Sequence, residues 1–524
     1  MADEINNSID EIQQAVAARV EEEAADIVSK NDEERKLWRF VRDCLRSNER
    51  GDGALYSELL RGKFVFNAAA GEWLYWTGHY WKRDTTEKAA GAVEVVAMEY
   101  VAAADRVQTS IDNAEAKKEK DLANSLKCLQ SDYLKRANKL RSINGMNACL
   151  KAAVRVEDGL SIYGDELDQN PWLLACANGV VDLRNGMLRD GRPDDWITMA
   201  SPIEYPGLDA DTSEWEKIVL EIFNDRKDVL EYVRKTLGYA ITGLNKVHDF
   251  FAWHGAGRNG KSLIFEAVAS TLGPLCGPIP AEMLLEQPGA RAAAAASPDI
   301  MMLRGLRIAY ASETDEGRKF SSSRVKWLTG GDRLTGRWPH DKYPVTFDPG
   351  HTLFLLTNHK PRAGADDFAF WERCRLLRFE ISFVKDREPD KEKNERKADT
   401  DLPEKLREMG PIILAWLVNG CLEWQHHGHL TPPPFVREAT AEYRREEDLV
   451  QEWMDSRAND DDPGAETKAS VLYNDFEQWY QAEIGKKAPS PKWFGKQLMR
   501  RFEKTKKSTG FFYIGLRLEE TYEM

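Results

Sequence analysis

The feature that most constrains this chain is a glycine-rich loop between two apolar stretches. Gly255 is followed, after four residues, by Gly260-Lys261-Ser262, which matches the G-x-x-x-x-G-K-[ST] pattern. The apolar run at 250–253 predicts a buried strand before the loop, and the spacing of apolar residues at 263–268 predicts a helix after it. A loop in this context presents backbone N–H groups and the positive end of a helix to phosphate. A chance match is the alternative, but the order of strand, loop and helix favours a nucleotide site.

Two side chains at the end of this loop have specific expected roles. We expect the ammonium group of Lys261 to reach the β- and γ-phosphates of ATP, and the hydroxyl group of Ser262 to hold Mg²⁺. The cofactor-binding residues that the pattern predicts are Gly255, Ala256, Gly257, Arg258, Asn259, Gly260, Lys261 and Ser262. ATP and Mg²⁺ are therefore the expected cofactors.

Length and composition narrow the class of protein. A chain of 524 residues corresponds to roughly three or four domains. We expect no membrane span, because no run of about eighteen apolar residues occurs, and the acidic N-terminus does not resemble a signal peptide. The seven cysteines form no C-x-x-C pair, which favours a reducing cytosol over a zinc or disulfide framework. With a net charge of −14, any contact with DNA has to come from local basic surface.

Two later apolar runs end in polar side chains that suit phosphoryl transfer. One run ends at Glu313 and the other at Asn358. A carboxylate at a strand end can hold the water ligands of Mg²⁺ and polarise the attacking water, and an amide can bind the γ-phosphate or orient that water. We therefore predict catalytic roles for both residues and a metal role, through water, for Glu313. A strand that simply ends at Glu313 is the alternative.

A further strand-like run carries arginines. Arg373 and Arg375 alternate ahead of the apolar pair Leu376-Leu377. We predict that Arg373, with Arg375 in reserve, reaches the γ-phosphate bound by a neighbouring subunit and stabilises charge in the transition state. An ordinary edge strand explains the alternation equally well.

Two local groups of basic residues are candidates for DNA contact. The first is a hairpin-like excursion whose tip carries Arg337, His340 and Lys342, for which a plain solvated hairpin is the alternative. The second lies near the C-terminus. There we predict a helix at 467–480, a basic helix at 491–503 and a strand pair at 511–518, an arrangement typical of a winged helix. The outward basic residues of that helix are Lys492, Lys496, Arg500 and Arg501. A small α/β cap with a solvated basic face is the alternative.

The remaining chain is predicted mainly as helix, with two small β regions. Aromatic runs at 63–83 predict a hairpin sheet whose aromatic side chains form a core in preference to stacking on bases. Two Asn-Gly pairs between residues 173 and 186 predict hairpins. Helices are predicted over much of 1–50 and 86–155, and at 213–224, 227–242, 411–425 and 435–455.

Several segments occur in an order that is more specific than any single motif. In chain order these are 178–183, 237–243, 255–262, 311–314, 328–332 and 357–361. Together they closely resemble the helicase part of the phage and plasmid primase–helicase family, whose relatives include the poxvirus primase-helicase. The resemblance covers about residues 60–450. It implies a superfamily 3 helicase: an α/β, AAA+-like P-loop ATPase core with an α-rich N-terminal domain, which the C-terminal winged helix fits.

The resemblance also implies roles for individual residues. By position, Asn358 matches the polar sensor residue, and Lys342 with His340 matches the pore hairpin that grips DNA. Family members often have two adjacent acids at the second motif, whereas Ser312 precedes Glu313 here. Whether Asp315 or Glu316 assists Glu313 therefore stays open.

The function that the resemblance implies is ATP-driven movement along single-stranded DNA by a ring, usually a hexamer, during replication of a phage, plasmid or integrated element. The expected partners are single-stranded and replication-fork DNA, further copies of the chain, and a separate primase or polymerase, since no primase domain is evident. The expected location is the cytosol of a bacterial host. Two alternatives stay open: an ATPase that loads or remodels proteins without unwinding DNA, and an origin-binding initiator.

The predicted order of domains follows from the same segments. We expect an acidic helical arm at 1–60, a collar domain at 61–240, the ATPase core at 241–430, a helical linker at 431–463 and the winged helix at 464–524. The linker boundary rests on the Asp-Asp-Asp-Pro-Gly stretch at 460–464.

Overall fold

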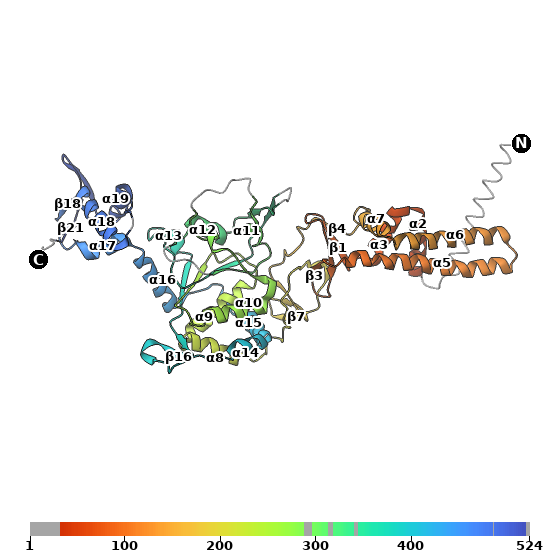
Figure 1. Cartoon of the computed structure of the whole chain (residues 1–524), viewed down its shortest axis with the longest axis horizontal. Helices are drawn as coiled ribbons and strands as arrows, with labels where there is room; N and C mark the ends of the chain where they lie inside the picture. The colour runs from red at the N-terminus through yellow and green to blue at the C-terminus, as the bar shows by residue number, and fades with distance from the viewer. Residues whose placement is uncertain (1–31, 288–295, 313–317, 340–343, 486, 520–524) are drawn as a thin grey trace. The chain divides into compact units, whose positions relative to one another are not determined.

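The computed structural model describes residues 32–287, 296–312, 318–339, 344–485 and 487–519 (Figure 1). The chain divides into two compact units. Unit 1 contains the described residues up to Asn170 together with Asp190–Met199, and unit 2 contains Pro171–Arg189 and the residues from Ala200 onward. This division is coarser than the five domains predicted above, which stay a prediction. Within the described residues, no helix combines the length and the apolar character that crossing a membrane requires.

Unit 1 is mainly helical, as its Ala-, Lys- and Glu-rich sequence predicts. Its helices are α2 (Asp32–Arg46), α3 (Asn48–Leu60), α4 (Lys88–Gly91), α5 (Val93–Ala116), α6 (Lys120–Leu140) and α7 (Ile143–Ala153). A buried ion pair links two of them, because Arg136 of α6 lies 2.6 Å from the carboxylate of Asp52 on α3. The hydroxyl group of Tyr100 also donates to Asp52, at 3.1 Å, so the buried carboxylate has two hydrogen-bonding partners.

The predicted hairpin sheet at 63–83 is confirmed. It consists of β1 (Phe64–Asn67), β2 (Glu72–Trp76) and β3 (Trp81–Arg83), and β4 (Ser161–Ile162) adds a parallel edge, in the order β3-β2-β1-β4. Its aromatic side chains are core residues. Trp81 is only 1% exposed and stacks on Trp196 with ring centroids 5.7 Å apart. The prediction that these aromatics pack in a core is therefore also confirmed.

Unit 2 begins with a small antiparallel sheet and two helices. The sheet contains β5 (Leu173–Cys176), β6 (Gly179–Asp182) and β7 (Met187–Arg189), and the helices are α8 (Ser213–Ile222) and α9 (Lys227–Ala240). Each of the two predicted Asn-Gly hairpins is present, and Gly186 in the second turn has φ 72°, a conformation that favours glycine.

A five-stranded parallel sheet forms the centre of unit 2. Its strands are β8 (Phe250–His254), β9 (Cys276–Pro278), β10 (Ile308–Ser312), β13 (Thr352–Thr357) and β14 (Cys374–Arg378), in the order β14-β8-β13-β10-β9. All neighbouring strands are parallel. The register pairs Ser312 with Leu356, and His254 with both Thr357 and Arg378. The carboxyl ends of four strands therefore lie along one edge, and the α/β class is as predicted.

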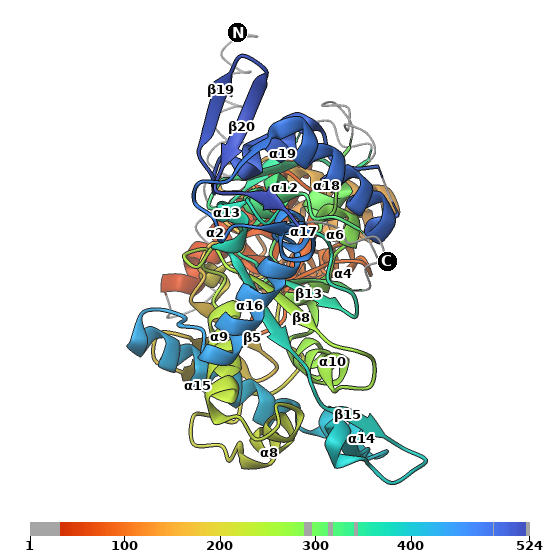
Figure 2. The same cartoon turned by 90° about the vertical axis from the view of Figure 1, so that its left-hand side faces the viewer.

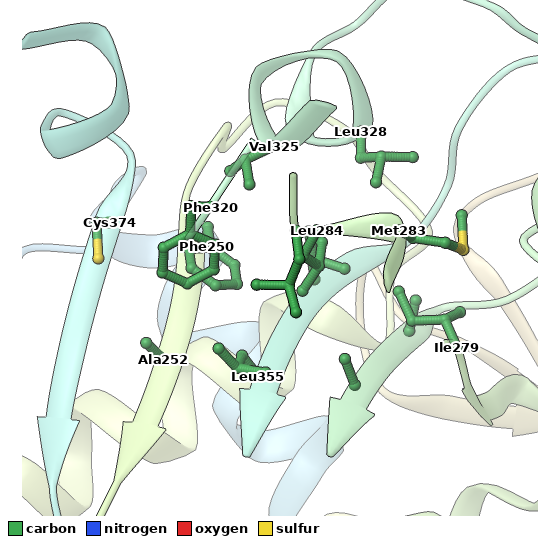
Figure 3. Close-up of a cluster of buried hydrophobic side chains, with 14 of the residues drawn as sticks. Phe250, Ala252, Ile279, Met283, Leu284, Phe320, Val325, Leu328, Leu355 and Cys374 are labelled. Carbon is green, nitrogen blue, oxygen red and sulfur yellow. The ribbon is translucent and has the colours of Figure 1, made fainter. Parts of the chain in front are cut away.

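Alternating side chains bury both faces of this sheet, as parallel sheets require. On one face, Phe250 and Ala252 of β8 and Leu355 of β13 pack with Val325 and Leu328 of α12 (Ser322–Thr329), as Figure 3 shows. On the other face, Phe265 of α10 (Lys261–Leu272) packs against Trp253 of β8 and Phe354 of β13. Phe251 of β8 stacks on Phe354. The strand before the glycine-rich loop is thus held from both sides.

Further helices and two two-stranded sheets, one antiparallel and one parallel, surround the central sheet. The helices are α11 (Pro298–Met301), α13 (Phe368–Trp371), α14 (Leu402–Glu408), α15 (Gly410–His427) and α16 (Pro434–Glu446). Two-stranded pairs are formed by β11 (Leu334–Gly336) with β12 (Val345–Phe347) and by β15 (Ser382–Val384) with β16 (Glu395–Lys397).

Helices α9 and α15 approach each other backbone to backbone. A Cβ atom on Gly238 would lie 2.2 Å from the backbone nitrogen of Cys421, and one on Gly420 would lie 2.3 Å from the carbonyl oxygen of Arg234. Only glycine at these two positions allows so close a crossing.

The C-terminal residues form a module with its own hydrophobic core. It contains α17 (Leu449–Arg457), β17 (Ala458–Asn459), β18 (Glu466–Lys468), α18 (Ala469–Ile484), α19 (Pro491–Leu498), β19 (Lys504–Lys507), β20 (Gly510–Ile514) and β21 (Arg517–Leu518). Its core includes Trp453 of α17, Phe476 of α18 and Phe494 of α19. The core therefore reaches upstream of the predicted linker boundary at 463.

Two helix predictions in this region are wrong. The helix predicted at 435–455 is interrupted, because Asp448 accepts from the backbone N–H of Gln451 at 3.1 Å and begins a new helix, α17. The basic helix predicted at 491–503 ends at Leu498. The residues after it form β19, which pairs with β20 as a hairpin that projects beyond α19 (Figure 2).

Candidate functional site

The glycine-rich loop connects the carboxyl end of β8 to the first turn of α10. Arg258 and Gly260 adopt left-handed backbone conformations, with φ of 62° and 80°. The loop is also tied to the chain beyond β14, since the N–H of Phe383 donates to the carbonyl oxygen of Arg258 at 2.7 Å. The loop therefore places backbone groups and the start of α10 at the carboxyl edge of the parallel sheet, where ligands of open α/β sheets bind.

Position 255 has to be glycine, because the surrounding atoms leave no room for a side chain. A Cβ atom there would lie 2.1 Å from Asn259 Nδ2 and 2.6 Å from the carbonyl oxygen of Phe379. Asn259 is itself buried: its Oδ1 accepts from the backbone N–H of Lys261 at 3.3 Å, and its Nδ2 has no hydrogen-bond partner among the described residues. Gly255, the first residue of the loop, thus packs directly against the Asn259 side chain, which itself hydrogen-bonds within the loop.

We predict that Gly255→Ala lowers the free energy of unfolding by about 1–3 kcal/mol, because the added methyl group overpacks a site bounded by backbone. The measurement is the midpoint of urea unfolding. Gly257→Ala is the matched control, since a Cβ atom at Gly257 would meet no heavy atom within 4 Å. Its expected change is within about 0.5 kcal/mol. Equal midpoints for the two variants would contradict the packing described for Gly255.

Lys261 connects the loop to the neighbouring strand. Its side chain is buried, and Nζ donates to the carbonyl oxygens of Gly255 and Thr357 at 3.2 and 2.7 Å and to Asn358 Oδ1 at 2.9 Å. Burial lowers the pKa of Lys261 to about 8. The structure therefore brings together two of the predicted site residues, Lys261 and Asn358, from segments almost one hundred residues apart in the sequence.

Of the other residues predicted at this edge, the structure describes some and not others. Ser262 is exposed in the first turn of α10. Glu313 lies outside the described residues, as do Asp315 and Glu316. The residue before Glu313, Ser312, ends β10 at the same edge of the sheet as the loop.

Sequence reasoning missed two basic side chains beside the loop. Burial, together with the nearby positive charges of Lys360 and Lys261, lowers the pKa of His254 to about 4, so the imidazole is neutral at pH 7. Lys360 pairs with Glu446 of α16. Lys360 could have been predicted to lie near the site, because it follows Asn358 by two residues. No local pattern indicated a role for His254, which simply ends an apolar run.

Arg373 and Arg375 lie at the opposite edge of the sheet, at the amino end of β14. Arg375 pairs with the carboxylate of Asp249 at 2.8 Å, and Arg373 Nη1 donates to the carbonyl oxygen of Ala369 at 2.9 Å. Burial raises the pKa of Asp249 to about 6 although Arg375 opposes the shift. β14 is an edge strand of the sheet, as the plainer interpretation of the arginine pattern predicted. Neither arginine is placed next to the loop of its own chain.

The hairpin predicted around 337–347 is present as β11 and β12. Arg337 directly follows β11 and is half-buried, and its backbone N–H donates to Ser297 Oγ at 3.1 Å. His340 and Lys342 lie outside the described residues. Trp338, the residue after Arg337, is 42% exposed.

The predicted basic residues of the C-terminal module fall into two groups. Lys492 and Lys496 lie on α19 and are exposed, and neither forms an ion pair with another described residue. Arg500 and Arg501 follow the helix and are paired: Arg500 lies 3.2 Å from the carboxylate of Asp366, and Arg501 contacts Asp448.

Comparison with known proteins shows what this chain is similar to. A family model described as D5 N terminal like matches residues 53–224. A protein of Acanthamoeba polyphaga mimivirus that is named a putative helicase is 28% identical over 449 residues, which is 82% of this chain and 45% of that protein. A putative helicase of Invertebrate iridescent virus 6 is 28% identical over 412 residues, covering 72% of this chain and 42% of that protein.

A more distant relative, named a putative primase, comes from African swine fever virus; it is 22% identical over 338 residues, covering 61% of this chain and 34% of that protein. This chain thus spans less than half the length of the three curated relatives. A solved structure described as the A form apo structure of the NrS-1 C terminal region aligns with a TM-score of 0.46 at 9% identity, covering 87% of this chain and 97% of that one. A TM-score of 0.46 indicates only partial agreement of the backbones.

These relatives come from viruses of eukaryotes, whereas the sequence alone led us to expect a bacterial host. The resemblance to primase–helicases rested on motifs spread over about residues 60–450, and the family match lies in the same part of the chain. By its family match and its viral relatives, this chain is related to the D5-like primase–helicases.

Proposed function

We propose that this chain is the ATP-hydrolysing helicase part of a DNA replication protein. Relatives named as helicases and a primase support a role of this class. The observation that carries the proposal is the position of Lys261. Its ammonium group lies at the carboxyl edge of a parallel sheet, between the glycine-rich loop and Asn358 of the next strand. That arrangement suits a phosphate-binding loop with a sensor amide beside it.

The residues present fit ATP with Mg²⁺. The glycine at 257 leaves open space above the loop, the N-terminus of α10 offers backbone N–H groups, and Lys261 offers a buried cation. We propose that Ser262 and, through water, Glu313 hold the metal ion. Bound ATP–Mg²⁺ supplies the phosphoanhydride that is hydrolysed. Asn358 then orients the attacking water, and the neutral imidazole of His254 adds no charge next to Lys261.

A second copy of the chain is needed to complete this site. Arg373 lies at the far edge of the sheet from the loop of its own chain, so it can serve the γ-phosphate only of a neighbouring subunit. We therefore propose a ring, with six subunits as the expected number. Arg375 suits this role less well, because its guanidinium group is paired with Asp249.

DNA contacts are proposed at two places. The hairpin of β11 and β12, with Arg337, His340 and Lys342 near its tip, is proposed to line the channel of the ring. The C-terminal module is proposed to be a winged helix, because its helices α17, α18 and α19 are followed by a hairpin and β18 pairs with that hairpin. Lys492 and Lys496 on α19 are proposed to face DNA.

The larger organisation follows from this proposal. An acidic arm, a collar, the ATPase core, a linker and the winged helix stay the proposed order of domains. The proposed partners are single-stranded DNA, fork DNA and a separate primase or polymerase, and the proposed location is the cytosol of a host cell.

Strand separation on a forked duplex tests the proposal. We expect the wild-type chain to release a labelled strand when ATP and Mg²⁺ are present, and EDTA to stop the release, because the reaction needs the metal ion. ATP hydrolysis without strand release on any fork would overturn the helicase assignment and favour an ATPase loader. Sequence-specific duplex binding without strand release would favour an origin-binding initiator.

A further inference from the structure

The C-terminal hairpin presents a surface that contains none of the residues predicted above to bind DNA. This surface, called the wing here, consists of β19 and β20 with the turn between them. Antiparallel pairing places Lys504 opposite Tyr513 and Lys506 opposite Phe511. Residues paired in this way, and those two apart along a strand, share one face of a sheet. One face of the wing therefore carries two lysines and two aromatic residues.

The inner end of this face is anchored in the module. Tyr513 is 1% exposed, and its hydroxyl group donates to the carbonyl oxygen of Gly495 in α19 at 2.9 Å. The outer end is free of the core: Phe511 is 48% exposed, and Figure 2 shows the hairpin extending past α19. An aromatic ring so exposed at the end of a hairpin contributes little to the core, so its face is open to a ligand.

The cations of the wing are available, whereas those after α19 are not. Lys506 is exposed and forms no ion pair with the described residues, and Lys504 Nζ lies 4.4 Å from the ring centroid of Phe511. Arg500 and Arg501 are instead held by Asp366 and Asp448. A phosphate group would have to displace a carboxylate to reach either arginine, whereas Lys506 is paired with no carboxylate of residues 32–287, 296–312, 318–339, 344–485 or 487–519.

We propose that the wing binds single-stranded DNA, with Lys504 and Lys506 on backbone phosphates and Phe511 stacked on an unpaired base. Lysines beside an exposed aromatic ring are the combination that such binding uses. Single-stranded DNA is favoured over duplex because the face of a base is open to a ring only where bases are unpaired. The inference rests on the proposed helicase function and extends it: the C-terminal module binds one of the separated strands.

The test is fluorescence anisotropy of the full chain without nucleotide, with a labelled oligo-dT strand and a blunt duplex as probes. Phe511→Ala is expected to weaken binding of oligo-dT at least about fivefold and to leave duplex binding unchanged, since one stacked base is lost. Lys506→Ala is expected to lower the slope of log affinity against log salt by about 0.7, the value for one phosphate contact on a single strand. Thermal melting checks that both variants fold.

Two controls make the outcome decisive. Lys385→Ala changes an exposed lysine outside the module and is expected to bind like the wild type. Arg501→Ala is expected to weaken binding less than Phe511→Ala. Unchanged oligo-dT binding by Phe511→Ala, an equal loss on the duplex probe, or a larger loss from Arg501→Ala would each overturn the assignment. Because no nucleotide is present, a chain that fails to hydrolyse ATP but shows wing-dependent binding would refute the proposed helicase function alone.

Discussion

Lys261→Ala is expected to reduce the rate of ATP hydrolysis by at least about 100-fold. The variant removes the side chain that joins the glycine-rich loop, the end of β13 and Asn358 by hydrogen bonds, and with it a preorganised positive charge. Loss of a single preorganised donor commonly costs that much in rate. The measurement is steady-state phosphate release, with circular dichroism to confirm folding. A variant that hydrolyses ATP at the wild-type rate would refute the assignment of the loop.

The pKa of Lys261 gives this prediction a second readout. Because the pKa is lowered to about 8, the ammonium group is charged below that pH and loses its proton above it. The affinity for a fluorescent ATP analogue should therefore fall as the pH rises through about 8, and the fall should be absent in Lys261→Ala. Lys385→Ala, in which the site is intact, should retain it. A merely structural lysine would leave the affinity insensitive to pH in this range.

Arg373→Ala is expected to lower ATP hydrolysis about 1,000-fold or more, the effect typical of an arginine supplied by a neighbour. The loop of the variant is intact, so binding of the ATP analogue should change little. Arg375→Ala should behave differently. It leaves the buried carboxylate of Asp249 without its partner, and we expect a loss of unfolding free energy of about 1–3 kcal/mol.

Mixing two inactive variants distinguishes a contribution in trans from one in cis. Subunits with Lys261→Ala keep Arg373, and subunits with Arg373→Ala keep the loop. If the arginine acts across an interface, some interfaces of a mixed ring contain both groups, and hydrolysis should partly return. No return of activity in rings shown by mass spectrometry to be mixed would refute the role of Arg373 in trans.

The sequence predicted the sheet and its loop well, because those features depend on local patterns. Apolar runs that end in polar residues located β8, β10, β13 and β14, and parallel strands bring their carboxyl ends to one edge. The contact of Lys261 with Asn358 follows from that rule without any knowledge of side-chain positions. The pairing of Arg375 with Asp249 was not predictable in this way, because nothing in either local pattern indicates the other residue.

The C-terminal module shows where local patterns fail. The sequence predicts a basic helix up to residue 503 and a strand pair from residue 511, so residues 504–507, Lys-Thr-Lys-Lys, lie between the two predicted elements. Strong basic character fits a helix surface and an edge strand equally well. Their strand conformation is decided by pairing with Phe511–Tyr513, which local spacing does not reveal. The break between α16 and α17 could have been found, since an Asp directly before a helical stretch is a common N-cap, and Asp448 immediately precedes Leu449.

The glycine pair Gly238 and Gly420 has a mechanical consequence. Between most packed helices, side chains can change rotamer and absorb small shifts, but at Gly238 and Gly420 the backbones of α9 and α15 meet directly. Helix α10, which begins at Lys261, packs on α15. A displacement of α15 by α10 would therefore be passed on to α9, because a rotamer change cannot take up a shift at the two glycines.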